Sequence, residues 1–347
     1  MNKFIFFIFL FFTINAFSES DPPQKVKGGF KKCTVYSYGY KFGKIDTESK
    51  KTEEISFYDE KSNLIELVFY YTVGSITKKY TNTYKYDIKG NKIEDVVYDS
   101  GGSILSKLIF KYDENRNLIE DVNYHSDGSS ISKYDYKYDV KGNIIEKVNY
   151  SDGSIIEKFT FKYDDKSNLF EGIFYDSAGS ITSKKTYKYD NKGNLIEFVD
   201  YYNDSSFFSK LISKYDNNGN KIEEVFNDND SSIAAKRSYK YDNKGNKIED
   251  VLYFSDGSIE MKYTYKYDNK GNKIEEVLYN SDGSIDYKLT YKYDENRNLI
   301  MLVLYNSDGS ISGKYTYKYD EDGNKIEEIT FDNKGIPVSK TEYIYSK

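Results

Sequence analysis

An eleven-residue stretch, Tyr-Lys-Tyr-Asp-Asn-Lys-Gly-Asn-Lys-Ile-Glu at residues 265–275, constrains this chain more than any other feature. Versions of it recur eleven times along the 347 residues, anchored on Asp59, Asp87, Asp113, Asp139, Asp164, Asp190, Asp216, Asp242, Asp268, Asp294 and Asp320. The step between copies is 26 residues in eight of the ten intervals, with one step of 28 and one of 25. A repeat of this kind predicts one elongated unit rather than several independent domains.

Two turns divide each repeat, and both have the chemistry of a short β-hairpin. The first begins with Asp268 and has Gly271 at its fourth position, which is typical of a type I turn followed by a left-handed glycine. The second, at residues 280–284, repeats this pattern twelve residues later. The chain also has 39 Tyr and 22 Phe but only 3 Pro, which suits β-strands. We therefore predict an all-β fold, a long antiparallel meander of 26-residue β-hairpin repeats.

The turns also predict which side chains share a face of the sheet, because side chains alternate along a strand. A symmetric turn at residues 268–272 would put Tyr265 opposite Glu275 and Tyr263 opposite Val277. One face would then be rich in Tyr with an embedded row of Glu. The other face would carry rows of Lys and Thr and be exposed to solvent.

Departures from the repeat make this reading testable. Glycine is replaced at the fourth turn position in four copies, by Ser62, Arg116, Ser167 and Arg297. Each of these residues must enter the left-handed region, at a cost of about 1 kcal/mol. The one short copy is predicted to close with a two-residue Asp152-Gly153 turn, which keeps Tyr150 opposite Ile155.

The N-terminal segments do not fit the repeat. Lys3 precedes an apolar run that ends at Phe12, and the small residues Ala16 and Ser18 follow. We interpret residues 1–18 as a secretory signal peptide cleaved after Ser18, since the apolar run is shorter than the ~20 residues of a membrane-spanning helix. Residues 19–50 are predicted to form a linker and a degenerate capping hairpin, and residues 51–347 the array. The protein is expected to be secreted or held in the cell envelope, with no membrane insertion beyond the signal peptide.

Composition excludes several classes of ligand. The 56 acidic and 50 basic residues are interspersed, so no basic stripe for nucleic acid is expected. One Cys and one His, His125, cannot build a zinc site, and the Asp-rich turns lack the spacing of a calcium loop. We predict no cofactor or metal. An open meander would leave free strand edges, which could pair edge to edge between molecules.

The motif Tyr-x-Tyr-Asp-x-x-Gly-Asn-x-Ile resembles the YD-repeat, or RHS-repeat, proteins of bacterial surfaces and secreted toxins. The resemblance covers roughly residues 45–345 and is visible in Tyr265, Tyr267, Asp268 and Gly271 of one copy. It implies a sheet that coils into a hollow shell with its Tyr face inward, and a location in the periplasm or on the outer surface of a bacterium. An open curved sheet is the alternative shape.

No residue pattern points to catalysis. Glu occurs at the position of Glu275 in ten of eleven copies, so it belongs to the repeating structure rather than to one site. The leading hypothesis is a non-catalytic scaffold that binds a glycan or a protein partner. The candidate binding residues are the rigid, amphipathic side chains Tyr263, Tyr265, Tyr287, Tyr291, Tyr315 and Tyr317. A secreted carbohydrate-active enzyme is one alternative. An outer-membrane β-barrel is the other, disfavoured because both turn series are equally short.

Overall fold

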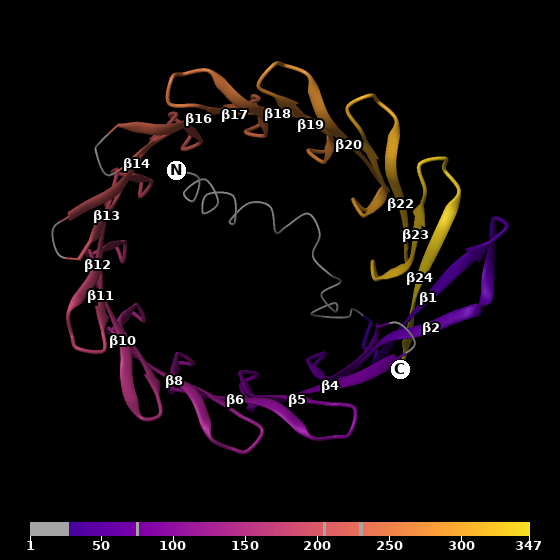
Figure 1. The fold of residues 1–347 in the computed structure, drawn as a ribbon, viewed down its shortest axis with the longest axis horizontal. Coiled ribbons are helices and arrows are strands. Elements are labelled where there is room, and N and C mark those ends of the chain that lie inside the picture. The colour runs from indigo at the N-terminus through magenta and orange to yellow at the C-terminus, as the bar shows by residue number, and fades with distance from the viewer. Residues whose placement is uncertain (1–27, 74–75, 204–205, 229–231) are drawn as a thin grey trace.

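The chain folds into a closed ring of antiparallel strands (Figure 1). The computed structural model describes residues 28–73, 76–203, 206–228 and 232–347, and these form 24 strands and no helix. Each strand pairs with its neighbours in sequence, and β1 also pairs with β24. The predicted all-β meander is confirmed, and of the two predicted shapes the structure has the closed one.

The strand bounds follow the two turn series of the repeat. The strands are β1 (Lys32–Lys41), β2 (Lys44–Tyr58), β3 (Leu64–Val73), β4 (Ile76–Tyr86), β5 (Lys92–Tyr98), β6 (Ile104–Tyr112), β7 (Leu118–Tyr124), β8 (Ser130–Tyr138), β9 (Ile144–Ser151), β10 (Ser154–Tyr163), β11 (Leu169–Asp176), β12 (Ile181–Tyr189), β13 (Leu195–Tyr202), β14 (Ser206–Tyr215), β15 (Lys221–Asn227), β16 (Ile233–Tyr241), β17 (Lys247–Tyr253), β18 (Ile259–Tyr267), β19 (Lys273–Asn280), β20 (Ile285–Tyr293), β21 (Leu299–Tyr305), β22 (Ile311–Tyr319), β23 (Lys325–Phe331) and β24 (Pro337–Ser346).

The N-terminal part of the chain takes part in ring closure. The predicted signal peptide, residues 1–18, and the first part of the 19–50 segment lie outside the described residues. The rest of that segment forms β1 and the start of β2, and β1 pairs with both β2 and β24. Since both ends of the meander are hydrogen-bonded to each other, the predicted edge-to-edge association would require the ring to open.

Each Asp turn is fastened by the side chains that define the repeat. The backbone N–H of Gly271 donates to the Asp268 carbonyl at 3.1 Å, and that of Asp268 donates to the Asn272 carbonyl at 2.9 Å. The Asp268 carboxylate accepts hydrogen bonds from the backbone N–H groups of Lys270 and Asn272, and from the Asn272 side-chain amide. This arrangement explains why Asp and Asn recur at these two positions.

The predicted backbone of the exceptional turns is confirmed. The φ angles of the four residues that replace glycine are 62°, 72°, 65° and 69°, for Ser62, Arg116, Ser167 and Arg297 respectively. In the short copy, Asp152 and Gly153 both have positive φ, and Tyr150 lies opposite Ile155. Local turn chemistry was therefore sufficient to place these loops.

The predicted register is wrong by one residue. Tyr265 lies opposite Glu276 rather than Glu275. The cause is a β-bulge, in which Lys273 and Ile274 on β19 together oppose one residue, Tyr267, on β18. A bulge inserts an extra residue into one strand, and a one-residue slip moves every following side chain to the other face.

The slip redistributes the two faces of the sheet. Tyr263 lies opposite Leu278, so the Tyr rows share their face with Glu276. Glu275 and Val277 instead lie on the face of the Lys row. In the pairing of β19 with β20, a second β-bulge lies between Leu278 and Tyr279 and shifts the register back by one residue at the opposite rim.

The bulge also explains the last Tyr of the motif. The hydroxyl of Tyr293 donates to the backbone carbonyl of Lys273, the bulged residue of the preceding Asp hairpin, at 3.0 Å. We call this contact the tyrosine staple. The same contact joins Tyr86 to Leu64, Tyr112 to Lys92, Tyr138 to Leu118, Tyr163 to Ile144, Tyr189 to Leu169, Tyr215 to Leu195, Tyr241 to Lys221, Tyr267 to Lys247, Tyr319 to Leu299 and Tyr345 to Lys325. The staple therefore ties each Asp hairpin to the next one around the ring.

The two turn series lie at different rims. In Figure 1 the turn between β1 and β2 and the turn between β23 and β24 lie on the outside of the ring, whereas the Asp turn between β22 and β23 lies on its inside.

Lysines in the Asp turns link neighbouring turns. For example, the Lys192 ammonium donates to the Asn217 carbonyl at 2.7 Å.

Burial is spread along the ring rather than concentrated in one core. A row of buried valines follows the Lys face, with Val277 only 4% exposed and lying opposite Lys288. Aliphatic stems of lysine can cover such apolar surface while the ammonium stays in water. The rest of this row is Val68, Val96, Val122, Val148, Val199, Val251 and Val303. A separate cluster of Cys33, Val35, Tyr58 and Tyr343 packs at the closing seam.

Candidate functional site

One face of the sheet carries Tyr263, Tyr265, Glu276 and Leu278 in the repeat, and we assign this face to the inside of the ring because its side chains are the more buried. Side chains converge on the concave side of a closed sheet. Accordingly, burial is the first cause of the raised pKa of Tyr265. The opposite, outer face carries Lys266, whose side chain is 70% exposed. The two faces therefore differ in both chemistry and accessibility.

All six predicted Tyr residues lie on this inner face. Tyr263 and Tyr265 are neighbours on β18, with ring centroids 6.3 Å apart and ring planes at 4°. Tyr287 lies opposite Leu278, and Tyr291 and Tyr315 lie opposite Leu302 from its two sides. Tyr317 lies opposite Glu328. The structure thus brings the six residues together on β18, β20 and β22, each of them half-buried.

A lysine that is paired with an acid lies between the aromatic rings of neighbouring tyrosines. The Lys273 ammonium lies 2.6 Å from the Glu276 carboxylate, and it lies 5.7 Å and 5.0 Å from the ring centroids of Tyr265 and Tyr291. These distances fit cation–π contacts. The same pair recurs as Lys92 with Asp95, Lys221 with Glu224, Lys247 with Asp250 and Lys325 with Glu328. Sequence reasoning missed these pairs because the register was one residue off.

Elsewhere the position of Lys273 is apolar, which divides the inner face into sectors. Leu118, Ile144, Leu169 and Leu195 occupy it in β7, β9, β11 and β13. In the same sector the rings of Phe159 and Phe174 meet edge to face at 5.0 Å. We call β15–β19, where this position holds lysine, the charged sector. The strands β7–β13 are apolar at this position but carry charges elsewhere on the inner face, such as the Lys185–Asp200 ion pair at 2.5 Å.

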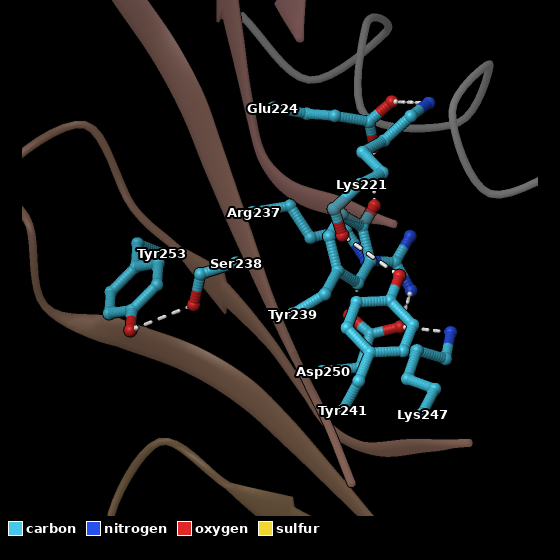
Figure 2. A network of polar contacts seen from close by, with 9 residues as sticks. All are labelled: Lys221, Glu224, Arg237, Ser238, Tyr239, Tyr241, Lys247, Asp250 and Tyr253. Carbon is cyan, nitrogen blue, oxygen red and sulfur yellow. Dashed lines mark hydrogen bonds and ion pairs between the residues drawn. The ribbon is translucent and has the colours of Figure 1, made fainter. Parts of the chain in front are cut away.

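The charged sector contains one network that departs from the repeat (Figure 2). The Arg237 guanidinium makes two hydrogen bonds to the Asp250 carboxylate, at 2.6 Å and 2.9 Å, and Lys247 contacts the same carboxylate at 2.9 Å. The Asp250 side chain is only 2% exposed, so both cations compensate a buried charge. Figure 2 shows Arg237, Tyr239 and Asp250 on one side of the sheet and Ser238 and Tyr253 on the other.

A second acid extends this network. The Tyr239 hydroxyl donates to the Glu224 carboxylate, which also binds the Lys221 ammonium at 2.6 Å. Burial, followed by this hydrogen bond, raises the pKa of Tyr239. Each acid of the network is therefore matched by a cation or a hydroxyl, which is the pattern of a structural network.

The outer face carries a second regular pattern, the Lys–Glu–Lys ladder. Glu275 binds Lys266 at 2.7 Å with one carboxylate oxygen and Lys288 at 2.8 Å with the other. The hydrogen bond from Lys266, together with that from Lys288, lowers the pKa of Glu275. The same three-residue unit is built on Glu94, Glu120, Glu146, Glu171, Glu197, Glu223, Glu249 and Glu327. The Glu row, predicted to lie on the Tyr face, therefore lies on the Lys face and meets Lys across strands.

Groups that could hold a metal do not gather in the described part of the chain. No cluster of three or more His, Cys, Asp or Glu residues with metal-binding geometry occurs among those residues. His125 lies at the start of a turn, where its backbone N–H donates to the Ser129 carbonyl at 2.8 Å. Within the described ranges, no helix is long and apolar enough to cross a membrane.

These features define a class of protein, a closed ring of β-hairpin repeats with a tyrosine-lined interior. No family model matches the chain, and the comparison with curated proteins finds no significant match. Among solved structures, the chain is similar to a complex of TcdB2, TccC3 and Cdc42, with 12% identity, 83% of this chain and 19% of that chain covered, and a TM-score of 0.36.

The chain is also similar to two further solved structures. The Photorhabdus luminescens Tc holotoxin pore is 12% identical, with 84% of this chain and 20% of that chain covered and a TM-score of 0.36. A porin-like protein from Bacteroides uniformis is 12% identical, with 92% and 98% covered and a TM-score of 0.25. The chain thus spans about a fifth of the length of the toxin chains that it matches.

Proposed function

We propose that this protein is a non-catalytic scaffold, exported from a bacterial cell, whose inner face binds a segment of a partner protein. The observation that carries this proposal is the lining of the ring. Six half-buried tyrosines lie on three neighbouring hairpins, beside fixed Lys–acid pairs. The apolar run that ends at Phe12 supports export. The motif of Tyr267, Asp268 and Gly271 supports placing the chain among the YD-repeat proteins.

The inner face suits a polypeptide better than a sugar. Stacking on a sugar requires an open ring face, but Lys273 lies over the rings of both Tyr265 and Tyr291. Glu276 holds that lysine at 2.6 Å, so a sugar would have to displace an ion pair. A polypeptide can instead use the edges and hydroxyls of the rings and the charges between them.

Free hydrogen-bonding groups support the same ligand class. Within the described residues, the hydroxyls of Tyr265, Tyr315 and Tyr317 make no hydrogen bond. Each can donate to a main-chain carbonyl of a bound segment. The charged sector and the strands with an apolar residue at the position of Lys273 then offer different side-chain environments along one path around the ring.

A non-catalytic role is supported by how the inner acids are held. Asp250 is bound by Arg237 and Lys247, and Glu276 by Lys273. These carboxylates are therefore occupied by fixed cations, as in a structural network. The carbohydrate-active enzyme remains the alternative and predicts hydrolysis of an oligosaccharide.

The test compares inner-face and outer-face variants of the full exported chain. The inner variant is Tyr265→Phe, Tyr315→Phe and Tyr317→Phe, which removes only hydroxyl groups. The control, Tyr279→Phe with Tyr305→Phe, changes tyrosines of the outer face. Each form of the protein is immobilised and incubated with extract of the native culture, and retained proteins are identified by mass spectrometry. We expect wild type and the control to retain the same partner protein and the inner variant to lose it. Binding of the purified partner then confirms the result. Equal loss in both variants, or binding on a glycan array without protein binding, would refute the proposal.

A further inference from the structure

One copy of the outer-face ladder lacks its central carboxylate. At the position that Glu occupies in nine ladder units, β21 has Met301. The backbone is unchanged there, since Met301 lies opposite Lys292 and Thr316 just as Glu275 lies opposite Lys266 and Thr290. Only the side chain differs.

Both flanking lysines of this unit are present without their carboxylate. In the nine complete units, one lysine from each neighbouring strand binds an oxygen of the same Glu. At Met301 the equivalent lysines are Lys292 and Lys314, and neither forms an ion pair with any described residue. Lys314 lies over the ring of Phe331, with its ammonium 4.6 Å from the centroid. The outer face thus has two cations at this point in a chain of net charge −6.

The strand between these lysines is uncharged, unlike its neighbours. β21 has the sequence Leu-Ile-Met-Leu-Val-Leu-Tyr, and among the described strands no other lacks a charged residue. On the outer face β21 presents Met301, Val303 and Tyr305, which lie opposite Lys292, Thr290 and Lys288. An uncharged strip therefore runs between two cations on the outer face.

We propose that this strip is a docking site for an acidic side chain of a partner protein, whose carboxylate takes the place of the missing Glu between Lys292 and Lys314. The nine complete units show the geometry that such a carboxylate would adopt, with one oxygen on each ammonium. A polypeptide is favoured over a small anion because exposed ion pairs alone contribute little in water. Apolar neighbours of the acidic residue would cover Met301.

This inference is independent of the function proposed for the inner face. It concerns the opposite side of the sheet, since Lys292 and Lys314 alternate with Tyr291 and Tyr315 along their strands. Loss of one interaction should leave the other unchanged, which keeps their tests separate.

Methionine NMR gives a direct test on the exported full chain. The sequence has 3 Met residues, and Met261 lies on the inner face, where it serves as an internal control. The probe is a six-residue peptide of alternating Leu and Glu, and its control has Gln in place of Glu. We expect the Leu-Glu peptide to shift the carbon-13 methyl signal of Met301 but not that of Met261. The Leu-Gln peptide and succinate at equal concentration should shift neither.

Variants then test the role of the two cations. Met301→Glu supplies a carboxylate from the chain itself and so completes a ladder unit like the nine others. It should weaken binding of the fluorescein-labelled Leu-Glu peptide about tenfold. Met301→Gln should bind as wild type does, and Lys266→Gln is the control for loss of an outer-face lysine. Lys292→Gln and Lys314→Gln should each weaken binding. Equal binding by Met301→Glu, or an equal response to succinate, would overturn the proposal.

Discussion

Removing one tyrosine staple tests whether neighbouring hairpins are tied through their bulges. In Tyr293→Phe the ring stays and only the hydroxyl that donates to the Lys273 carbonyl is lost. A neutral hydrogen bond contributes about 0.5–1.5 kcal/mol net. The freed carbonyl is near a rim and can bind water, so we expect a loss of about 1 kcal/mol. This is about a fivefold increase in local opening of β19 and β20.

Hydrogen exchange followed by mass spectrometry measures this opening directly. Amides of residues 273–293 should exchange about five times faster in Tyr293→Phe than in wild type, while hairpins on the far side of the ring stay unchanged. The control is Tyr279→Phe, an outer-face tyrosine at the other rim. A triple variant, Tyr267→Phe, Tyr293→Phe and Tyr319→Phe, should extend faster exchange over three hairpins. If Tyr293→Phe exchanges no faster than Tyr279→Phe, the staple does not stabilise the array.

Three further predictions concern charge, backbone and closure. Glu275→Gln removes two ion pairs and should lower the free energy of unfolding by about 0.4–2 kcal/mol at pH 7. Hydrogen bonds from Lys266 and Lys288 lower the pKa of Glu275 below 4.5, so the carboxylate loses its stabilising effect as the pH falls through this lowered pKa. Urea titrations should then show that the difference in stability between wild type and Glu275→Gln vanishes. A difference unchanged at pH 3 would contradict the role of the ion pairs. Arg297→Gly relieves a φ of 69° and should raise the free energy of unfolding, measured in urea, by up to about 1 kcal/mol, whereas Gly271→Ala should lower it. Tyr345→Cys places a second thiol opposite Cys33 across the closing seam, so oxidation should give an intramolecular cross-link visible by gel mobility. Burial raises the pKa of the Cys33 thiol to about 12, so the oxidation needs a strong oxidant. Failure to form the cross-link under these conditions would mean that the ring is open.

Local chemistry accounts for the part of the fold that the sequence predicted. Asp268, Gly271 and Asn272 determine their turn by themselves, so its position, its backbone and the shortened turn at Asp152 were all recognisable. The choice between an open and a closed sheet was not, because closure depends on the pairing of β1 with β24 at opposite ends of the array.

The inner-face site was predicted only in part, for a different reason. Alternation placed Tyr263 and Tyr265 together, but nothing in the residue pattern distinguishes the bulge at Lys273 and Ile274 from a regular strand. The pairing of Lys273 with Glu276 was lost with it. Arg237 and Met301, by contrast, could have been found, since each breaks the pattern of its own repeat.

Ring closure also has a consequence for the order of folding. Nearly every contact in the molecule joins strands that are adjacent in sequence, but Lys32 pairs with Ser346, 314 positions away. In a flexible chain, closing so long a loop costs about 3 kcal/mol more than closing a loop of about a dozen residues. Hairpins that have already formed a curved sheet remove most of this cost, because they hold the two ends near each other. The seam should therefore form last, and only when every intervening repeat has folded, so that closure makes an otherwise local array cooperative as a whole.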